Sequence, residues 1–147
     1  MLRRLALTTV ASALALGASS SAAVAVGPLP LPLLSPSDAL TVTVADSGNP
    51  RADGTFELRC DGARAGGTHP AAKKACARLA ELSKNGQDPF APVPQDRMCT
   101  QQHGGPATAH VKGTWRGRSV DAHFARTNGC EISRWENLQP VLPMARS

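Results

Sequence analysis

The sequence predicts an α+β domain in which helices pack on an antiparallel sheet. Short alternating segments rich in β-branched residues indicate strands, and one segment rich in Ala, Lys and Leu indicates a helix. The strand and helix patterns occupy separate parts of the chain, as in α+β folds rather than in parallel α/β folds. Four cysteines in a chain of 147 residues add the expectation of disulfide bonds.

Residues 1–25 are a predicted signal peptide. Arg3 and Arg4 precede an apolar run, residues 5–17, that is too short to span a bilayer. Small residues then lead to an A-x-A cleavage pattern at Ala23–Ala25, so we expect export and cleavage after that triplet. Loss of the two arginines lowers the formal net charge from +5 to +3.

The mature chain is expected to begin with a flexible arm, residues 26–38, followed by a folded domain over residues 39–147. The arm is rich in Pro, Leu and Ser, and repeated prolines prevent both helix formation and sheet pairing. Residues 40–44 and 55–60 alternate as strands do, with turn residues between them.

A Gly-rich loop at residues 61–67 precedes a predicted helix over residues 71–82. Thr68 is the expected N-cap, and Asn85–Gly86 ends the helix. Helical spacing predicts one buried face, made of Ala72, Ala75, Cys76, Leu79 and Leu82.

A hairpin is predicted beyond this helix, with arms at residues 108–115 and 118–125 joined by Arg116–Gly117. Residues 131–138 predict a short helix or turn, and residues 140–142 a last edge strand. Alternation predicts an inward face on the hairpin, made of Ala109, Val111, Gly113, Trp115, Val120, Ala122 and Phe124.

The four cysteines, Cys60, Cys76, Cys99 and Cys130, predict two disulfides in an exported protein. Their spacing lacks the Cys-x-x-Cys pairs typical of zinc sites. Three pairings are possible, and pairing of sequence neighbours is the simplest. Each bond between neighbours would stabilise the fold by roughly 3 kcal/mol in the chain-entropy estimate.

The sequence argues against several function classes. It contains no Gly-x-Ser-x-Gly, no His-Glu-x-x-His and no phosphate-binding loop, so we expect no enzyme and no cofactor. It has no Tyr and no basic run longer than Lys73–Lys74, which argues against nucleic-acid binding. His110 and His123 are expected to face each other across the hairpin, but no further ligands are apparent around them, so we expect no metal site.

The segment from Arg97 to Pro106 combines features that rarely occur together. It is polar and has no helical or strand period, yet it contains a half-cystine and ends in Gly104–Gly105–Pro106. An exposed loop held by a disulfide is what a protease needs in a tightly bound pseudo-substrate, because little conformational freedom is left to lose on binding. The same features fit an ordinary stapled connection equally well.

The sequence resembles the Streptomyces subtilisin inhibitor family. The resemblance covers residues 39–138 and includes the half-cystines in their number and setting. Its motifs are residues 67–72 (GTHPAA), 98–100 (MCT), 113–117 (GTWRG) and 128–131 (NGCE).

This resemblance implies a dimer of domains, each with a five-stranded antiparallel sheet and two helices. It implies the disulfides Cys60–Cys76 and Cys99–Cys130, and a reactive bond two residues after the third cysteine, Gln101–Gln102. In the family pattern an asparagine, here Asn128, supports the loop from behind. The protease-binding residues around the bond are then Met98, Cys99, Thr100 and His103.

We therefore expect a secreted, extracellular, homodimeric inhibitor that blocks subtilisin-like serine proteases by substrate-like binding. A metalloprotease is a possible second partner, because some relatives bind one, whereas nucleic acid and membrane are not expected partners. The alternative is a secreted interaction protein or a transglutaminase substrate that offers Gln95, Gln101 or Gln102 as acyl donor.

Overall fold

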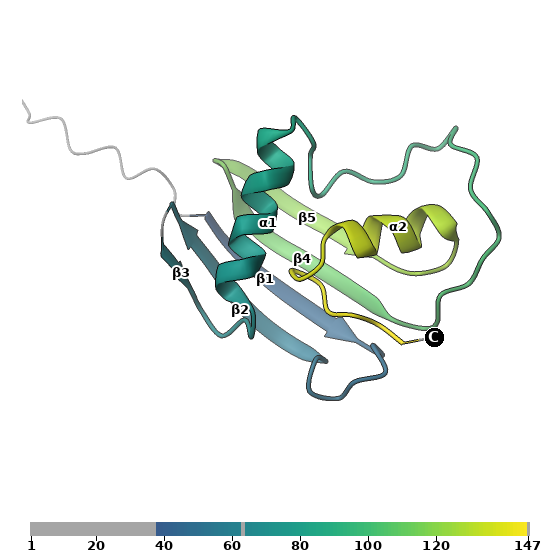
Figure 1. The fold of residues 1–147 in the computed structure, drawn as a ribbon, viewed down its shortest axis with the longest axis horizontal. Coiled ribbons are helices and arrows are strands. Elements are labelled where there is room, and N and C mark those ends of the chain that lie inside the picture. Colours follow the sequence, from purple (N-terminus) through teal and green to yellow (C-terminus); the bar gives the residue numbers. More distant parts are fainter. Residues whose placement is uncertain (1–37, 63, 147) are drawn as a thin grey trace, which may run out of the picture. The chain divides into compact units, whose positions relative to one another are not determined.

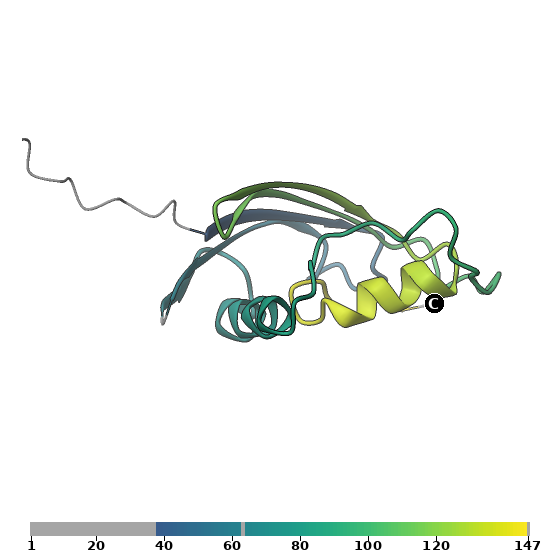
Figure 2. The same ribbon diagram turned by 90° about the horizontal axis from the view of Figure 1, so that it is seen from above.

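The structure is a computed structural model that describes residues 38–62 and 64–146. The predicted signal peptide and residues 26–37 of the predicted arm lie outside the described residues, and Asp38 already belongs to the first strand. In the described part, five antiparallel strands form one sheet that carries two helices on one face (Figure 1 and Figure 2). The predicted fold class is confirmed.

The sheet has the order β3-β2-β1-β4-β5. Its strands are β1 (Asp38–Ala45), β2 (Gly54–Asp61), β3 (Arg64–Gly66), β4 (Thr108–Trp115) and β5 (Arg118–Phe124). The helices are α1 (Ala72–Lys84) and α2 (Gly129–Asn137).

β1 occupies the middle of the sheet because it pairs with β2 on one side and β4 on the other. Val42 lies opposite Phe56 of β2 and Val111 of β4. Alternation places Leu40, Val42 and Val44 under the helices, where each is nearly inaccessible to solvent. The period-2 pattern of the sequence therefore builds the core directly.

The hairpin of β4 and β5 turns at Arg116 and Gly117, as predicted. Both residues have positive φ, 50° and 74°, which is the backbone of a type I′ turn. The predicted inward face of the hairpin is buried except at Gly113, which is exposed.

Helix α1 packs on the sheet through Ala75, Cys76, Leu79 and Leu82, which confirms the predicted buried face apart from the half-buried Ala72. The disulfide Cys60–Cys76 ties it to β2. The predicted N-cap at Thr68 is wrong. The Thr68 hydroxyl accepts a hydrogen bond from the Glu57 N–H (2.8 Å), and the helix begins after Ala71 without a side-chain cap.

Two further expectations are wrong. Part of the predicted Gly-rich loop is strand β3, in which Ala65 pairs with Cys60 of β2. Residues 140–142 form a turn instead of an edge strand, because the Val141 N–H donates to the Leu138 carbonyl (2.7 Å) and the Val141 carbonyl bonds to the His69 Nε2 (3.0 Å).

Both helices lie on the same face of the sheet, and no helix of the described residues covers the other face (Figure 2). Its side chains are polar and largely exposed. They include Thr41, Thr43, Glu57, Arg59, His110, Lys112, Asp121 and His123.

Candidate functional site

A long connection leaves α1, passes around α2 and enters β4 (Figure 1). It contains the reactive segment, defined here as Met98–His103. The segment has no regular secondary structure, as expected, and all its residues are exposed except the half-buried Cys99. Met98 is 95% exposed.

Three tethers hold the reactive segment to the body of the domain. The disulfide Cys99–Cys130 fixes its first part, and the pairing of neighbouring cysteines expected from the resemblance is confirmed. The Gly129 N–H donates to the Thr100 carbonyl (3.0 Å), and the Gly104 N–H donates to the Arg126 carbonyl (2.8 Å).

The tethers enclose the predicted reactive bond. Gln101, Gln102 and His103 lie between the Thr100 and Gly104 anchors, and all three side chains face solvent. Every anchor comes from residues 126–130, between the end of β5 and the first turn of α2. The exposed residues are therefore held on both sides by one compact part of the domain.

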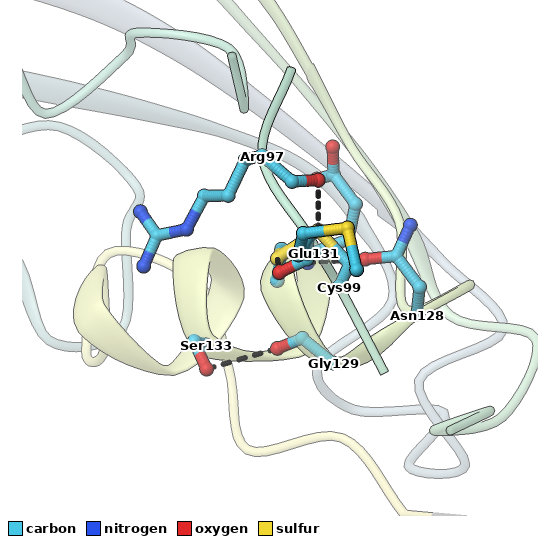
Figure 3. Close-up of a disulfide and its surroundings, with 8 residues drawn as sticks. Arg97, Cys99, Asn128, Gly129, Glu131 and Ser133 are labelled. Atoms are coloured by element: carbon cyan, nitrogen blue, oxygen red, sulfur yellow. Dashed lines mark hydrogen bonds between the residues drawn. A yellow bond between two sulfur atoms is a disulfide. The ribbon is translucent and has the colours of Figure 1, made fainter. Parts of the chain in front are cut away.

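Asn128 begins α2 as its N-cap, and its side-chain oxygen accepts from the Glu131 N–H (3.0 Å). Figure 3 shows this residue beside the Cys99–Cys130 disulfide at the start of the helix. Within the described residues the side chain bonds to α2 rather than to the reactive segment. Its predicted role in supporting the segment would thus act through Gly129 and Cys130, which the cap positions.

Two glycines allow the segment and its support to approach closely. A Cβ on Gly129 would overlap the Thr100 Oγ1, and one on Gly104 would lie 2.8 Å from the Arg126 Nε and from Ile132. Real Cβ atoms essentially never lie this close to another heavy atom, so a side chain at either position would force its neighbours to move. The sequence indicates Gly104–Gly105 as the end of the loop, but it does not predict that Gly104 packs closely against its neighbours.

Arg134 is a supporting residue that sequence reasoning missed. Its guanidinium donates to the carbonyls of Ala91 (2.7 Å), Phe90 (3.3 Å) and His123 (2.7 Å), and lies over the Phe124 ring at 3.9 Å. It therefore joins α2 to the start of the connection and to β5. Among side chains, only the forked guanidinium of Arg is suited to donate to several carbonyls at once. An Arg in an amphipathic helix was therefore the sequence signal that could have indicated this supporting role.

A second group of polar side chains lies on the open face of the sheet. His110 and His123 face each other across β4 and β5, as expected. The expectation that no further ligand accompanies them is wrong, because Asp121 contacts His110 (Nε2 to Oδ1, 2.6 Å). This hydrogen bond, assisted by the charge of Lys112, holds the pKa of Asp121 below its usual value.

A family model described as subtilisin inhibitor-like matches residues 36–128. The chain belongs to this family. The matched range contains the whole reactive segment and ends at Asn128.

Individual members of the subtilisin inhibitor-like family are similar over most of the domain. Subtilisin inhibitor-like protein 1 of Streptomyces cacaoi is 36% identical over 100 residues, which cover 65% of this chain and 84% of that protein. The subtilase-type protease inhibitor of Streptomyces fradiae is 32% identical, covering 65% of this chain and 67% of that protein.

Among solved structures, the chain is similar to Streptomyces caespitosus sermetstatin, crystallised in complex with Bacillus licheniformis subtilisin. Identity is 29%, the TM-score is 0.43, and the match covers 74% of this chain and 96% of that one. Family membership favours a protease inhibitor over the alternative of an interaction protein or transglutaminase substrate.

Proposed function

We propose that the protein is a secreted inhibitor of subtilisin-like serine proteases and that Gln101–Gln102 is its reactive bond. The observation that carries the proposal is the set of three tethers on the reactive segment. The segment is exposed where a protease must reach it and anchored at Cys99, Thr100 and Gly104, on both sides of the bond. Family membership supplies the class of enzyme.

The tethers account for inhibition in place of ordinary cleavage. The protease serine attacks the Gln101 carbonyl, and the oxyanion hole stabilises the oxygen that becomes negative. The new amine belongs to Gln102. It cannot leave, because Gly104, two residues further along the chain, is held by the hydrogen bond from its N–H to the Arg126 carbonyl. Both ends stay in reacting position, so re-formation of the bond outruns hydrolysis.

The same anchors raise affinity. A free peptide loses conformational freedom in several residues when it enters a protease, and this loss opposes binding. Here the backbone around Gln101 is already ordered, so more of the contact energy becomes affinity. In this arrangement Gln101 enters the main specificity pocket, Met98, Cys99 and Thr100 contact the enzyme before the bond, and His103 contacts it after the bond.

Secretion and assembly belong to the same proposal. Export rests on the predicted signal peptide alone. As a separate finding, none of the helices in residues 38–62 and 64–146 is long and apolar enough to cross a membrane. We infer a homodimer from the family pattern, and the uncovered face of the sheet offers a surface for it. Sedimentation equilibrium of the mature protein tests this assembly, which a monomer at all concentrations would contradict.

The inhibitor acts by one-to-one capture rather than by turnover, so titration is the decisive experiment. Purified, oxidised mature protein is added to subtilisin, and the complex is analysed by mass spectrometry at low pH. We expect a linear loss of protease activity, complete at one reactive segment per enzyme, with cleavage at Gln101–Gln102. Full protease activity together with complete digestion of the protein would refute the proposal.

A matched pair of variants locates the reactive bond. Gln101→Asp places a carboxylate in a largely apolar pocket, and we expect inhibition to weaken by at least about 100-fold, since burying an unpaired charge is costly. Gln95→Asp makes the same chemical change at another exposed glutamine outside the reactive segment and is expected to inhibit as the wild type does. Equal effects of the two variants would mean that the bond lies elsewhere.

A further inference from the structure

Arg126 is a buried charged residue directly behind the reactive segment. It follows β5 and is only 7% exposed. Its Nη1 donates to the Ala145 carbonyl (2.9 Å), but none of the ion pairs among the described residues includes Arg126. Its Nε is also buried and has no hydrogen-bond partner among these residues. Burial of a charge and of an unpaired donor is unfavourable, so the stability of the fold alone does not explain an arginine here.

Arg126 contacts Gly104 through both its backbone and its side chain. Its carbonyl accepts the hydrogen bond from the Gly104 N–H (2.8 Å), the tether that follows the proposed reactive bond. Gly104 is buried, and a Cβ built on it would lie 2.8 Å from the Arg126 Nε and from Ile132 of α2. The guanidinium therefore packs against the same residue whose N–H the Arg126 carbonyl holds.

The guanidinium is held in turn by the last part of the described chain, Pro143–Arg146. The first carbonyl of this part accepts from the Trp135 Nε1 (2.8 Å), and its last N–H donates to the Ser47 carbonyl (2.9 Å). Ala145, whose carbonyl accepts from Arg126, lies between these two bonds and packs against the core. The position of the guanidinium thus depends on the body of the domain.

We propose that the Arg126 side chain is a positioning group for the leaving-group side of the reactive bond. The inference rests on the proposed function, in which the Gln102 amine must stay beside the acyl-enzyme until the bond re-forms. Gly104 is the anchor on that side of the bond, and the guanidinium restrains both Gly104 and the carbonyl that binds it. Loss of the guanidinium should free the amine without changing how the protease first meets the segment.

Arg126→Met in the oxidised mature protein separates this role from a contribution to the fold. Methionine carries no charge, and exchange of a buried charge for a packed apolar residue is often neutral for stability. We expect the rate of association with subtilisin to stay near the wild-type value. The lifetime of the complex, followed by recovery of protease activity, should fall by at least about tenfold, as for loss of a hydrogen bond from a charged donor. Mass spectrometry should show more chain cleaved at Gln101–Gln102.

Arg78→Met is the matched control. Arg78 also donates to a backbone carbonyl, that of Asn137 (2.9 Å), but its other bonds go to Glu81 and the Asn137 side chain, at the far end of α2 from the reactive segment. This variant should keep the wild-type lifetime. Gly104→Ala disturbs the proposed contact from its other partner and should shorten the lifetime as Arg126→Met does.

Amide hydrogen exchange at Gly104, measured by NMR on the free protein, supplies a readout without protease. Exchange requires the N–H to leave the Arg126 carbonyl, so Arg126→Met should accelerate it by at least about tenfold while a core amide such as that of Val111 changes little. Equal acceleration at both amides would mean that the variant only destabilises the fold, and this would overturn the proposal.

An unchanged exchange rate at Gly104 would also overturn the proposal, and so would a wild-type complex lifetime in Arg126→Met. Failure of the wild type to inhibit subtilisin would instead refute the proposed function. The exchange rates would still decide whether the Arg126 side chain holds Gly104 in place.

Discussion

In the proposed binding mode, Gln101 is the residue that selects the protease. Its side chain is exposed in the free inhibitor and, in the proposed mode, fills the main specificity pocket of the enzyme. Subtilisin has a broad, mostly apolar pocket that accepts a neutral amide with some loss, whereas the trypsin pocket holds an aspartate that requires a cation. We therefore expect inhibition of subtilisin and weak or no inhibition of trypsin.

Gln101→Lys should create inhibition of trypsin. The new ammonium would pair with the pocket aspartate, and the tethers at Thr100 and Gly104 should present it in the same backbone conformation. Inhibition constants for trypsin and subtilisin, measured on both proteins, check this expectation. A lysine variant that still fails to inhibit trypsin would place the reactive bond elsewhere.

His69 is a buried residue whose protonation should limit stability in acid. Its Nδ1 accepts from the Ala71 N–H (3.2 Å), and its Nε2 lies 3.0 Å from the Val141 carbonyl, to which a neutral ring can donate. Burial lowers its pKa below the ordinary value of 6.5. The unfolded chain thus takes up this proton at a higher pH than the native protein does, and stability is lost as the pH falls below 6.5.

His69→Gln should reduce this pH dependence. Glutamine has a donor and an acceptor but does not titrate, so the variant should be less stable at neutral pH and lose less stability on acidification. Urea unfolding of both proteins at about pH 7.5 and about pH 5, on either side of the ordinary histidine pKa, measures the difference. Equal losses of stability in the two proteins would show that His69 does not control the pH dependence of stability between these two pH values.

At the scale of elements, the junction between the reactive segment and α2 should be sensitive to a single methyl group. Gly129→Ala would force its Cβ against the Thr100 Oγ1, and overpacking of this kind costs about 1–3 kcal/mol. We expect the Thr100 tether to shift and inhibition of subtilisin to weaken by about tenfold or more, equivalent to about 1.4 kcal/mol.

Gly66→Ala is the matched control for this variant. Gly66 lies at the end of β3 with ordinary φ, and an added Cβ there would meet open space. It should therefore inhibit as the wild type does. Full activity of Gly129→Ala would mean that the contact between Thr100 and Gly129 does not shape the reactive segment.

The elements that sequence predicted well are those whose core face repeats with a regular period. β1, β4 and β5 alternate over seven or eight residues, and α1 repeats its apolar face over 13 residues. β3 has only three residues beside glycines, too few to display a period. The apolar pair Val141–Leu142 predicts a strand from its local pattern, and this pattern does not reveal the contact of the Val141 carbonyl with His69, 72 residues away in sequence.

The candidate site also has features that the sequence predicts and features that it does not. The reactive segment was predicted from a cysteine within an exposed aperiodic stretch, and the resemblance then placed the bond within it. Two of the three tethers were not predictable, because they join backbone groups such as the Gly104 N–H and the Arg126 carbonyl, which have no side-chain signature. Asp121 was predictable, since it shares strand parity with His123.

For the molecule as a whole, the two disulfides should stabilise the fold alike but contribute differently to inhibition. Cys60–Cys76 and Cys99–Cys130 close loops of 16 and 31 residues. Replacing either pair by alanine should cost about 3–4 kcal/mol in the chain-entropy estimate, measured by urea unfolding. Only the second bond joins the reactive segment to α2.

The Cys99→Ala/Cys130→Ala variant should therefore behave as an ordinary substrate: subtilisin cleaves it, the bond does not re-form, and the protease is released active. The Cys60→Ala/Cys76→Ala variant, where it remains folded, should still inhibit. The lifetime of each complex, followed by recovery of protease activity, distinguishes the two. Equal lifetimes would show that the Cys99–Cys130 bond does not prevent turnover.

The order of the strands has a consequence for the molecule after cleavage. The bond Gln101–Gln102 separates β1 and β2 from β4 and β5, yet β1 lies beside β4 in the middle of the sheet. Residues Ala39 to Ala45 pair across this boundary with residues of β4, and Val42 meets Val111 there in the core. A nicked molecule is thus a pair of complementary fragments that share a continuous sheet, and cutting the chain leaves a two-chain protein with its interior closed.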